Sequence, residues 1–207
     1  MTAERRLEIA RRLHALARTG LHFCTEEYDR QRYEEIEALT VELLAGPSES
    51  EQSHLTALWA GETGYVTPKV EVRAATFDAE GRVLLVRERL DGRWTLPGGW
   101  ADVNESPSQS VEKEIEQESG YQARAVKLAA LYDRNRHAHG PTLFHSWKAF
   151  FLCEILGGHA RTSYETDAVD WFVLDALPAM STGRSTPQQV RRMHEHWLAR
   201  ELPTDFD

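Results

Sequence analysis

A single segment, residues 98–120, constrains the fold more than any other part of the chain. It opens with two adjacent glycines after a proline, which indicates a backbone with unusual dihedral angles or a closely approaching ligand. Ser106-Pro107-Ser108-Gln109 then has the pattern of a capping box with proline in the first helical position. Because Gly120 is typical of the position just beyond a helix end, the spacing predicts a helix over 107–119.

Three polar side chains share one face of this expected helix. Glu114, Gln117 and Glu118 stand at positions i, i+3 and i+4, which places them on the same side. Two neighbouring carboxylates repel each other, so a cation between them would relieve the arrangement, and such hard oxygen ligands suit Mg²⁺ or Mn²⁺. A lone pair of this kind is usually a solvated acidic face. The attached glycine loop and the marked helix ends favour a metal site.

The other faces of the expected helix have different environments. Val111 and Ile115 occupy an adjacent face, which we expect to pack on a sheet. We expect Glu112 and Glu116 to point away toward solvent.

The segment resembles the Nudix signature, G-x5-E-x7-R-E-U-x-E-E-x-G-U, in which U is a bulky apolar residue. Gly99, Glu105, Glu114, Glu118 and Gly120 fit this signature with no insertion or deletion. The resemblance implies an α+β fold, namely a Nudix α/β/α sandwich with a mixed sheet. It also implies a metal-dependent hydrolase that cleaves the pyrophosphate bond of a nucleoside diphosphate linked to another moiety and releases a nucleoside monophosphate. Gly99, Glu105 and Gly120 are the structural positions of the motif.

Two positions depart from the signature. Lys113 replaces the arginine, which keeps the charge but loses the planar fork. We expect it to flank the catalytic site and to pair with Glu105. Gln117 replaces a glutamate, and its amide oxygen can ligate a metal without adding negative charge. Both changes are expected to weaken metal binding or slow turnover, so a second function class stays open: a catalytically weakened Nudix fold that acts as a nucleotide sensor or interaction module.

The resemblance assigns the metal to named ligands. Glu114 and Glu118 are the expected metal ligands and catalytic carboxylates, and Gln117 is a weakened third ligand. The backbone oxygen of Gly98 or Gly99 is a further candidate. The expected cofactor is Mg²⁺ or Mn²⁺.

Three carboxylates are candidates for the general base. Glu165 and Asp167 belong to a polar segment that precedes an expected strand at 169–173, and members of the family often take the base from a distant loop. Glu114 itself is the other candidate. An ordinary polar surface loop is the competing interpretation of the 164–167 segment.

The substrate site is assigned from residues around the glycine loop and the first strands. Arg73 and Arg87 are candidates for phosphate contacts, although isolated arginines are also typical surface charges. Trp100 is a candidate for stacking on a base or a choline-like cation, and Asp102 is assigned to the same site. For Trp94, core packing is the favoured interpretation.

Residues before position 64 follow a helical pattern throughout. We expect one helix from residue 4 that Gly20 ends, a second from Thr25 to the break at Gly46-Pro47, and a short third helix with Trp59. About 60 residues of helix are marginal alone. They are therefore expected to pack on the rest of the chain or on a second copy of it.

The whole chain resembles the two-part Nudix subgroup that includes CDP-choline pyrophosphatases and proteins labelled ADP-ribose pyrophosphatases. This implies a helical domain at 1–64 for dimerisation and substrate shaping, a Nudix domain at 66–207, a homodimer, and a substrate of the CDP-choline or ADP-ribose type. The wider resemblance is carried by Leu16-Ala17-Arg18-Thr19-Gly20-Leu21, Tyr28-Asp29-Arg30-Gln31-Arg32-Tyr33, Thr67-Pro68-Lys69-Val70 and the segment 91–103.

Strand patterns dominate the chain after residue 66. Residues 70–77 and 83–88 are expected to form a hairpin, and 186–200 a last helix. The His-rich stretch 134–141 is interpreted as a flexible loop at the rim of the substrate site. Further strands are expected at 94–96, 123–132, 147–155 and 169–173.

Net charge and cysteine content limit the expected partners and cellular location of the protein. The formal net charge is -9, which disfavours nucleic acid and anionic membranes as partners, so an RNA-end hydrolase is the least favoured alternative. The two cysteines, Cys24 and Cys153, show no metal-binding or disulfide spacing. The charged N-terminus has no signal-peptide pattern. We expect a cytoplasmic protein with a small nucleotide substrate.

Overall fold

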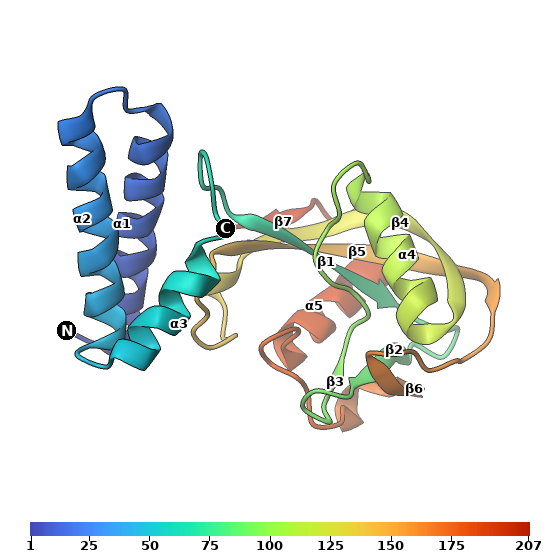
Figure 1. Ribbon diagram of the computed structural model, residues 1–207. Coiled ribbons are helices and arrows are strands. Elements are labelled where there is room, and N and C mark those ends of the chain that lie inside the picture. Colours follow the sequence, from blue (N-terminus) through green and yellow to red (C-terminus); the bar gives the residue numbers. More distant parts are fainter. The chain divides into compact units, whose positions relative to one another are not determined.

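The computed structural model describes all residues, 1–207, and the chain divides into two compact units (Figure 1). One unit comprises Met1–Pro68 and Pro141–His145. The other comprises Lys69–Gly140 and Ser146–Asp207. None of the helices combines the length and the apolar character that a membrane span requires.

The first unit consists of three helices: α1 (Ala3–Phe23), α2 (Glu27–Ala45) and α3 (Glu49–Trp59). The first two run antiparallel beside each other, as the blue ribbons in Figure 1 show. Their core is small, because only four apolar side chains of this unit are buried, and Ala17 lies outside the cluster that the other three form. Those three residues are Ala10, Val41 and Trp59, with Leu43, Leu44, Leu55, Leu143 and Phe144 packed against them.

The expected helix stop at Gly20 is wrong, because α1 continues through it to Phe23. A Cβ atom at Gly20 would lie 2.3 Å from the ring of Tyr33 in α2. Glycine within a helix costs about 1 kcal/mol relative to alanine. Here it allows a tyrosine ring to lie directly on the helix backbone. The glycine therefore marks a close helix–helix contact.

The second unit contains a mixed sheet of four strands in the order β1-β5-β4-β7. β1 (Lys69–Thr76) pairs parallel with β5 (Ser146–Gly158), and β5 pairs antiparallel with β4 (Tyr121–Asp133). A short strand, β7 (Asp205–Phe206), which the sequence patterns missed, pairs parallel with β4. The expected mixed sheet is confirmed.

A second sheet has the order β3-β2-β6 and is antiparallel throughout. Its strands are β2 (Val83–Glu88), β3 (Trp94–Thr95) and β6 (Thr166–Phe172). Two short 3-10 helices, Arg134–Arg136 and Leu174–Ala176, complete the connections.

The expected hairpin between residues 70–77 and 83–88 is wrong. The chain does turn back, because the Asp78 amide donates to the Arg82 carbonyl at 3.0 Å and an isolated bridge joins Phe77 to Val83. The two strands then enter different sheets. Both are buried on both faces over most of their length, so neither shows the alternation that would identify its partner.

The core of the second unit lies on both sides of the mixed sheet. On one side, α4 (Pro107–Ser119) covers the sheet with Val111 and Ile115, which are fully buried as expected. On the other side lie the second sheet and α5 (Pro187–Leu198) (Figure 1). The buried residues of that side include Ala75, Val83, Leu85, Leu96, Phe150, Leu152, Val190 and Met193.

α4 begins and ends as its local sequence predicts, whereas α5 begins as expected but ends at Leu198, before the expected residue 200. The capping box of Ser106 and Gln109 is complete, and Gly120 ends α4 in the left-handed conformation at φ 78°. α5 begins with a second capping box, formed by Thr186 and Gln189. Both helices have proline in the first turn, where no amide hydrogen is needed.

One prediction for α4 is wrong. Glu112 does not simply face solvent, because its carboxylate accepts a hydrogen bond of 2.8 Å from the backbone amide of Ala125. The pairing of β4 with β5 shifts register between Ala125 and Lys127. Glu112 therefore binds the backbone of β4 at an irregularity of the ladder. Glu116, in contrast, is exposed as expected.

Candidate active site

The glycine loop lies directly against the backbone of β1. Gly98 has φ 144°, and a Cβ atom there would come within 2.1 Å of the Val72 carbonyl oxygen. The amide of Val72 donates to the Gly99 carbonyl at 2.9 Å, and the amide of Ala74 donates to the Pro97 carbonyl at 2.8 Å. The carbonyl between them, that of Gly98, accepts no hydrogen bond. It is therefore the loop carbonyl that is free to bind a ligand.

Glu118 is buried behind this loop and is held by it. Its Oε2 accepts a hydrogen bond of 2.8 Å from the Gly98 amide. Burial, reinforced by the nearby charges of Glu114 and Glu88, raises the pKa of Glu118 to about 8, although Arg73 and the Gly98 amide favour the ionised form. A carboxylate in such a place is ionised at neutral pH only when additional positive charge is present.

Glu114 lies one helical turn away, beside the other glycine. A Cβ atom at Gly99 would approach the Glu114 Oε1 to 2.8 Å, so the missing side chain leaves room for this carboxylate. Burial raises the pKa of Glu114, with Glu165 acting in the same direction, while Arg73 opposes the shift. Glu165 is exposed on the segment before β6, and its charge reaches Glu114. The structure therefore brings three of the predicted acidic side chains into one electrostatic neighbourhood.

Lys113, on α4, binds the loop that connects Gly99 to the start of that helix. Its Nζ lies 2.6 Å from a carboxylate oxygen of Asp102 and 2.7 Å from one of Glu105, so the expected pair with Glu105 is confirmed. These hydrogen bonds raise the pKa of Lys113 above its usual range. Glu105 also accepts a hydrogen bond from the Ser110 hydroxyl at 3.0 Å. A point charge that bridges two carboxylates thus retains the loop without an arginine fork.

Arg73 is buried, not a surface charge. Its guanidinium is bound by the Glu71 carboxylate and donates to the Leu96 carbonyl at 3.1 Å. Its positive charge opposes the upward pKa shifts of both Glu114 and Glu118. The geometry makes it a buried counter-charge beneath the carboxylates. Its predicted contact with phosphate stays a prediction.

The remaining candidates lie in separate environments. Arg87 pairs with Asp167 at 2.6 Å and lies over the Trp94 ring, 5.9 Å from its centroid. Because this ion pair occupies the Asp167 carboxylate and lowers its pKa, Glu165 is the free acid of that segment. Trp94 packs on the core, as favoured. Trp100 is 51% exposed, so its ring is accessible to a ligand.

Gln117 is exposed on α4. It forms no hydrogen bond with the Gly98 amide, which donates to Glu118. Its expected role as a third metal ligand stays a prediction.

Sequence reasoning missed three buried charged residues of this region, Glu71, Glu88 and Lys148. Lys148 is fully buried, and its Nζ lies 2.7 Å from both carboxylate oxygens of Glu71. Glu88 is also buried and forms an ion pair of 3.0 Å with Arg184. The available signal was a charged residue inside an apolar strand pattern, since such residues are rarely buried unless they are paired.

The donor set fits a divalent ion that shares its coordination with substrate. No group of three or more His, Cys, Asp or Glu side chains is arranged to hold a metal ion. Two carboxylates, Glu114 and Glu118, lie at the loop whose Gly98 carbonyl is free. Mg²⁺ is usually bound through one or two carboxylates together with water and substrate phosphates. A site of this composition is therefore sufficient.

Comparison with known families gives two matches that together span most of the chain. Residues 4–59 match the UDP-X-like, N-terminal oligomerisation domain. Residues 67–193 match the NUDIX domain.

Individual relatives agree with these matches. The Bacillus subtilis (strain 168) protein named "Putative ADP-ribose pyrophosphatase YjhB" is 41% identical over 97% of this chain and 96% of its own length. The solved structure of an ADP-ribose pyrophosphatase from Streptococcus suis 89-1591 is 38% identical, covers 68% of this chain and 100% of that one, and has a TM-score of 0.62. The structure of a UDP-X diphosphatase covers 100% of both chains at 29% identity with a TM-score of 0.63.

The glycine loop and the paired carboxylates of α4 thus lie within the residues that match the NUDIX domain. The chain belongs to the Nudix family and is a Nudix pyrophosphohydrolase that acts on a nucleoside diphosphate linked to another moiety.

Proposed function

We propose that this protein hydrolyses ADP-ribose to AMP and ribose 5-phosphate with Mg²⁺ or Mn²⁺ as cofactor. The observation that carries the chemistry is the buried Glu118 at the glycine loop, with Glu114 beside it and the Gly98 carbonyl free. The choice of ADP-ribose is supported by the two relatives named for it, at 41% and 38% identity. CDP-choline and UDP-linked compounds are the alternatives within the same chemistry.

Glu114, Glu118 and the Gly98 carbonyl would hold the divalent ion. When bound, such an ion neutralises diphosphate charge and lowers the pKa of water. The protein contributes rigid placement. The Gly98 amide orients Glu118 at 2.8 Å, and Lys113 keeps the loop on α4 through two ion pairs.

Glu165 is the proposed general base. It is exposed, no ion pair neutralises it, and its charge acts on Glu114. Its carboxylate would take a proton from the attacking water while the new P–O bond forms. The bond between that phosphorus and the bridging oxygen then breaks, and the second phosphate leaves. Loss of a general base typically costs a factor of about 10² to 10⁴ in rate.

The test is an assay of the purified full chain with ADP-ribose, CDP-choline and a UDP-linked sugar, with Mg²⁺, Mn²⁺ or chelator. We expect metal-dependent release of AMP from ADP-ribose. Glu118→Gln should lower kcat by at least about 10², and Glu165→Gln by a similar factor. Glu116→Gln, an exposed change on the same helix, should retain activity.

Each outcome assigns or removes a role. Absence of turnover with any compound contradicts the proposed function. Turnover of CDP-choline or the UDP-linked sugar alone replaces ADP-ribose as the substrate. Retained activity in Glu165→Gln moves the general base to Glu114.

We further propose that the protein is a cytoplasmic homodimer assembled through α1 and α2. The match of residues 4–59 to an oligomerisation domain supports the assembly. Large apolar side chains of these two helices are exposed, namely Leu16, Phe23, Tyr28 and Leu39. Both cysteines are free thiols, which is consistent with a reducing compartment.

A further inference from the structure

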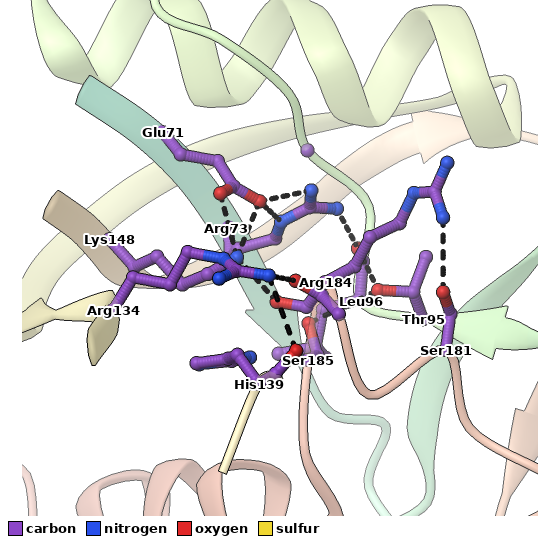
Figure 2. Close-up of polar contacts among 12 residues, drawn as sticks. Glu71, Arg73, Thr95, Leu96, Arg134, His139, Lys148, Ser181, Arg184 and Ser185 are labelled. Atoms are coloured by element: carbon purple, nitrogen blue, oxygen red, sulfur yellow. Dashed lines mark hydrogen bonds and ion pairs between the residues drawn. The ribbon is translucent and has the colours of Figure 1, made fainter. Parts of the chain in front are cut away.

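The loop before α5 is held by buried basic side chains at three successive carbonyls. His139 Nδ1 lies 2.7 Å from the carbonyl oxygen of residue 182, Arg134 Nη2 lies 3.4 Å from that of 183, and Lys148 Nζ lies 2.7 Å from that of 184. All three donors are at least nine-tenths buried. Figure 2 shows them converging on the loop. We call this arrangement the carbonyl clamp.

The clamp is joined to the candidate active site. Lys148, besides binding the loop, contacts both carboxylate oxygens of Glu71 at 2.7 Å. Glu71 also binds Arg73, whose charge acts on Glu114 and Glu118. The position of the loop is thus coupled to the same ion network that lies beneath the catalytic carboxylates.

Side-chain hydrogen bonds secure both ends of the loop. The Ser181 hydroxyl donates to Asp91 at 2.6 Å, and the hydroxyls of Ser185 and Thr95 lie 3.1 Å apart. Such a loop has little freedom, because moving it would leave buried charges without partners. The rim-loop interpretation of residues 134–141 is wrong at His139, which is buried in the clamp.

Among the residues whose carbonyls are bound by the clamp, 182–184, only Arg184 has a long side chain. Its Nε lies 3.0 Å from Glu88, and its Nη1 lies 3.0 Å from the Ser181 hydroxyl and 3.4 Å from Asp91. Its side-chain hydrogen bonds come from Nη1 and none comes from Nη2, and 27% of the side chain is exposed. In Figure 2 the side chain extends away from His139 and toward Ser181. Part of its guanidinium fork is therefore available to a ligand.

The charges around Arg184 explain why a ligand would need it. Glu88 is buried beside it, and the charge of Glu88 acts on Glu118. Two other cations near these acids are already paired: Arg73 with Glu71, and Lys113 with two carboxylates. A diphosphate that approaches these acids is repelled unless positive charge meets it, and a side chain with free donors would bind phosphate oxygens alongside the divalent ion.

We propose that Arg184 binds a phosphate of the nucleoside diphosphate substrate and that the carbonyl clamp holds it in the binding position. This inference rests on the proposed function for the identity of the substrate. Arginine suits the role because its planar fork can bind Glu88 on one edge and phosphate on the other.

The test compares Arg184→Ala, Arg184→Lys and Arg82→Ala. Arg82 is a matched control, since it also pairs with two acids, Asp78 at 2.7 Å and Glu80 at 3.6 Å, but lies in the turn after β1. Binding of the α,β-methylene analogue of ADP-ribose is measured by calorimetry with Mg²⁺, and KM and kcat are measured with ADP-ribose. Thermal unfolding verifies that each variant is folded.

We expect Arg184→Ala to raise both the analogue Kd and KM by about tenfold or more, as expected for a lost charge-assisted contact, with a smaller fall in kcat. Arg184→Lys should recover part of the affinity, and Arg82→Ala should match the wild type. His139→Ala should also raise the Kd, and adding it to Arg184→Ala should have no further effect, because both changes act through one side chain.

An analogue Kd within twofold of wild type in Arg184→Ala overturns the inference, as does full additivity of the His139 and Arg184 changes. Failure of the proposed function is seen separately. In that case the wild type releases no AMP from ADP-ribose, whatever the behaviour of the Arg184 variants.

Discussion

His139 is buried between two cations, Arg134 and Lys148, and its Nδ1 donates to the Thr182 carbonyl at 2.7 Å. Burial, with Lys148 second, lowers its pKa from 6.5 to about 4, while the hydrogen bond to Thr182 and the charge of Glu71 oppose the shift. The folded protein therefore contains a neutral His139 throughout the weakly acidic range.

This shift predicts a stability change with pH. Because the folded pKa lies below the unfolded one, the contribution of His139 is complete above pH 6.5 and is lost as the pH falls toward 4. The loss is at most about 3 kcal/mol. We expect His139→Gln to flatten the dependence of the urea-unfolding free energy on pH between 6.5 and 4.

His194→Gln, whose pKa is also lowered by burial but which lies outside the clamp, should keep most of the wild-type slope. An identical slope in wild type and His139→Gln would show that the pKa of His139 is the same in the folded and unfolded states.

Residue identities predicted the acidic centre of the site better than its surroundings. Glu114 and Glu118 could be placed on one face because their spacing is local. Lys148 and Glu71 are 77 positions apart in the sequence, so no pattern within either strand could predict that they pair. The role of Arg184 likewise depends on its ion pair with Glu88, which lies in β2, far away in the sequence.

At the element scale, α1 and α2 are packed unusually closely where Gly20 faces Tyr33. Intrinsic propensity favours alanine over glycine by about 1 kcal/mol within a helix. The added Cβ would lie 2.3 Å from the ring, and overpacking of this kind typically costs about 1–3 kcal/mol. We expect Gly20→Ala to lower the melting temperature and to speed hydrogen exchange in α1, despite its better helix propensity.

Gly61→Ala is the control, because no atom lies within 4 Å of the Cβ position there. It should change stability by no more than about 0.5 kcal/mol. Replacing Tyr33 by leucine in the Gly20→Ala background should recover stability. A gain in stability from Gly20→Ala alone would mean that the tyrosine ring moves aside freely.

The ends of α4 were predictable because several local signals agree there, whereas the single glycine at position 20 did not end α1 and the strand partners were not predictable. Ser106 and Gly120 define α4 through capping groups within one turn of its ends. The partner of β1 is β5, more than 70 residues later, and the strand is buried on both faces. The hairpin expected from chain proximity therefore failed, although the reversal at Asp78 was real.

At the scale of the whole molecule, the exposed apolar side chains of α1 and α2 require an explanation. Leu16 is 58% exposed and Leu39 is 56% exposed. Several such side chains gathered on one short helical unit are typical of a surface that another protein covers. The match of residues 4–59 to an oligomerisation domain supports the proposal that a second copy of this chain covers it.

We therefore predict that Leu39→Glu converts the wild-type dimer to a monomer, because burying a carboxylate in an apolar interface without a partner is strongly unfavourable. Leu198→Glu, a change of another exposed leucine at the end of α5, should leave the dimer intact. Light scattering after size-exclusion chromatography measures the mass directly. A monomeric wild type contradicts the proposed assembly, and a dimeric Leu39→Glu places the interface on another surface. If the dimer forms as proposed, the melting temperature of the wild type should also rise with protein concentration, while that of Leu39→Glu should not.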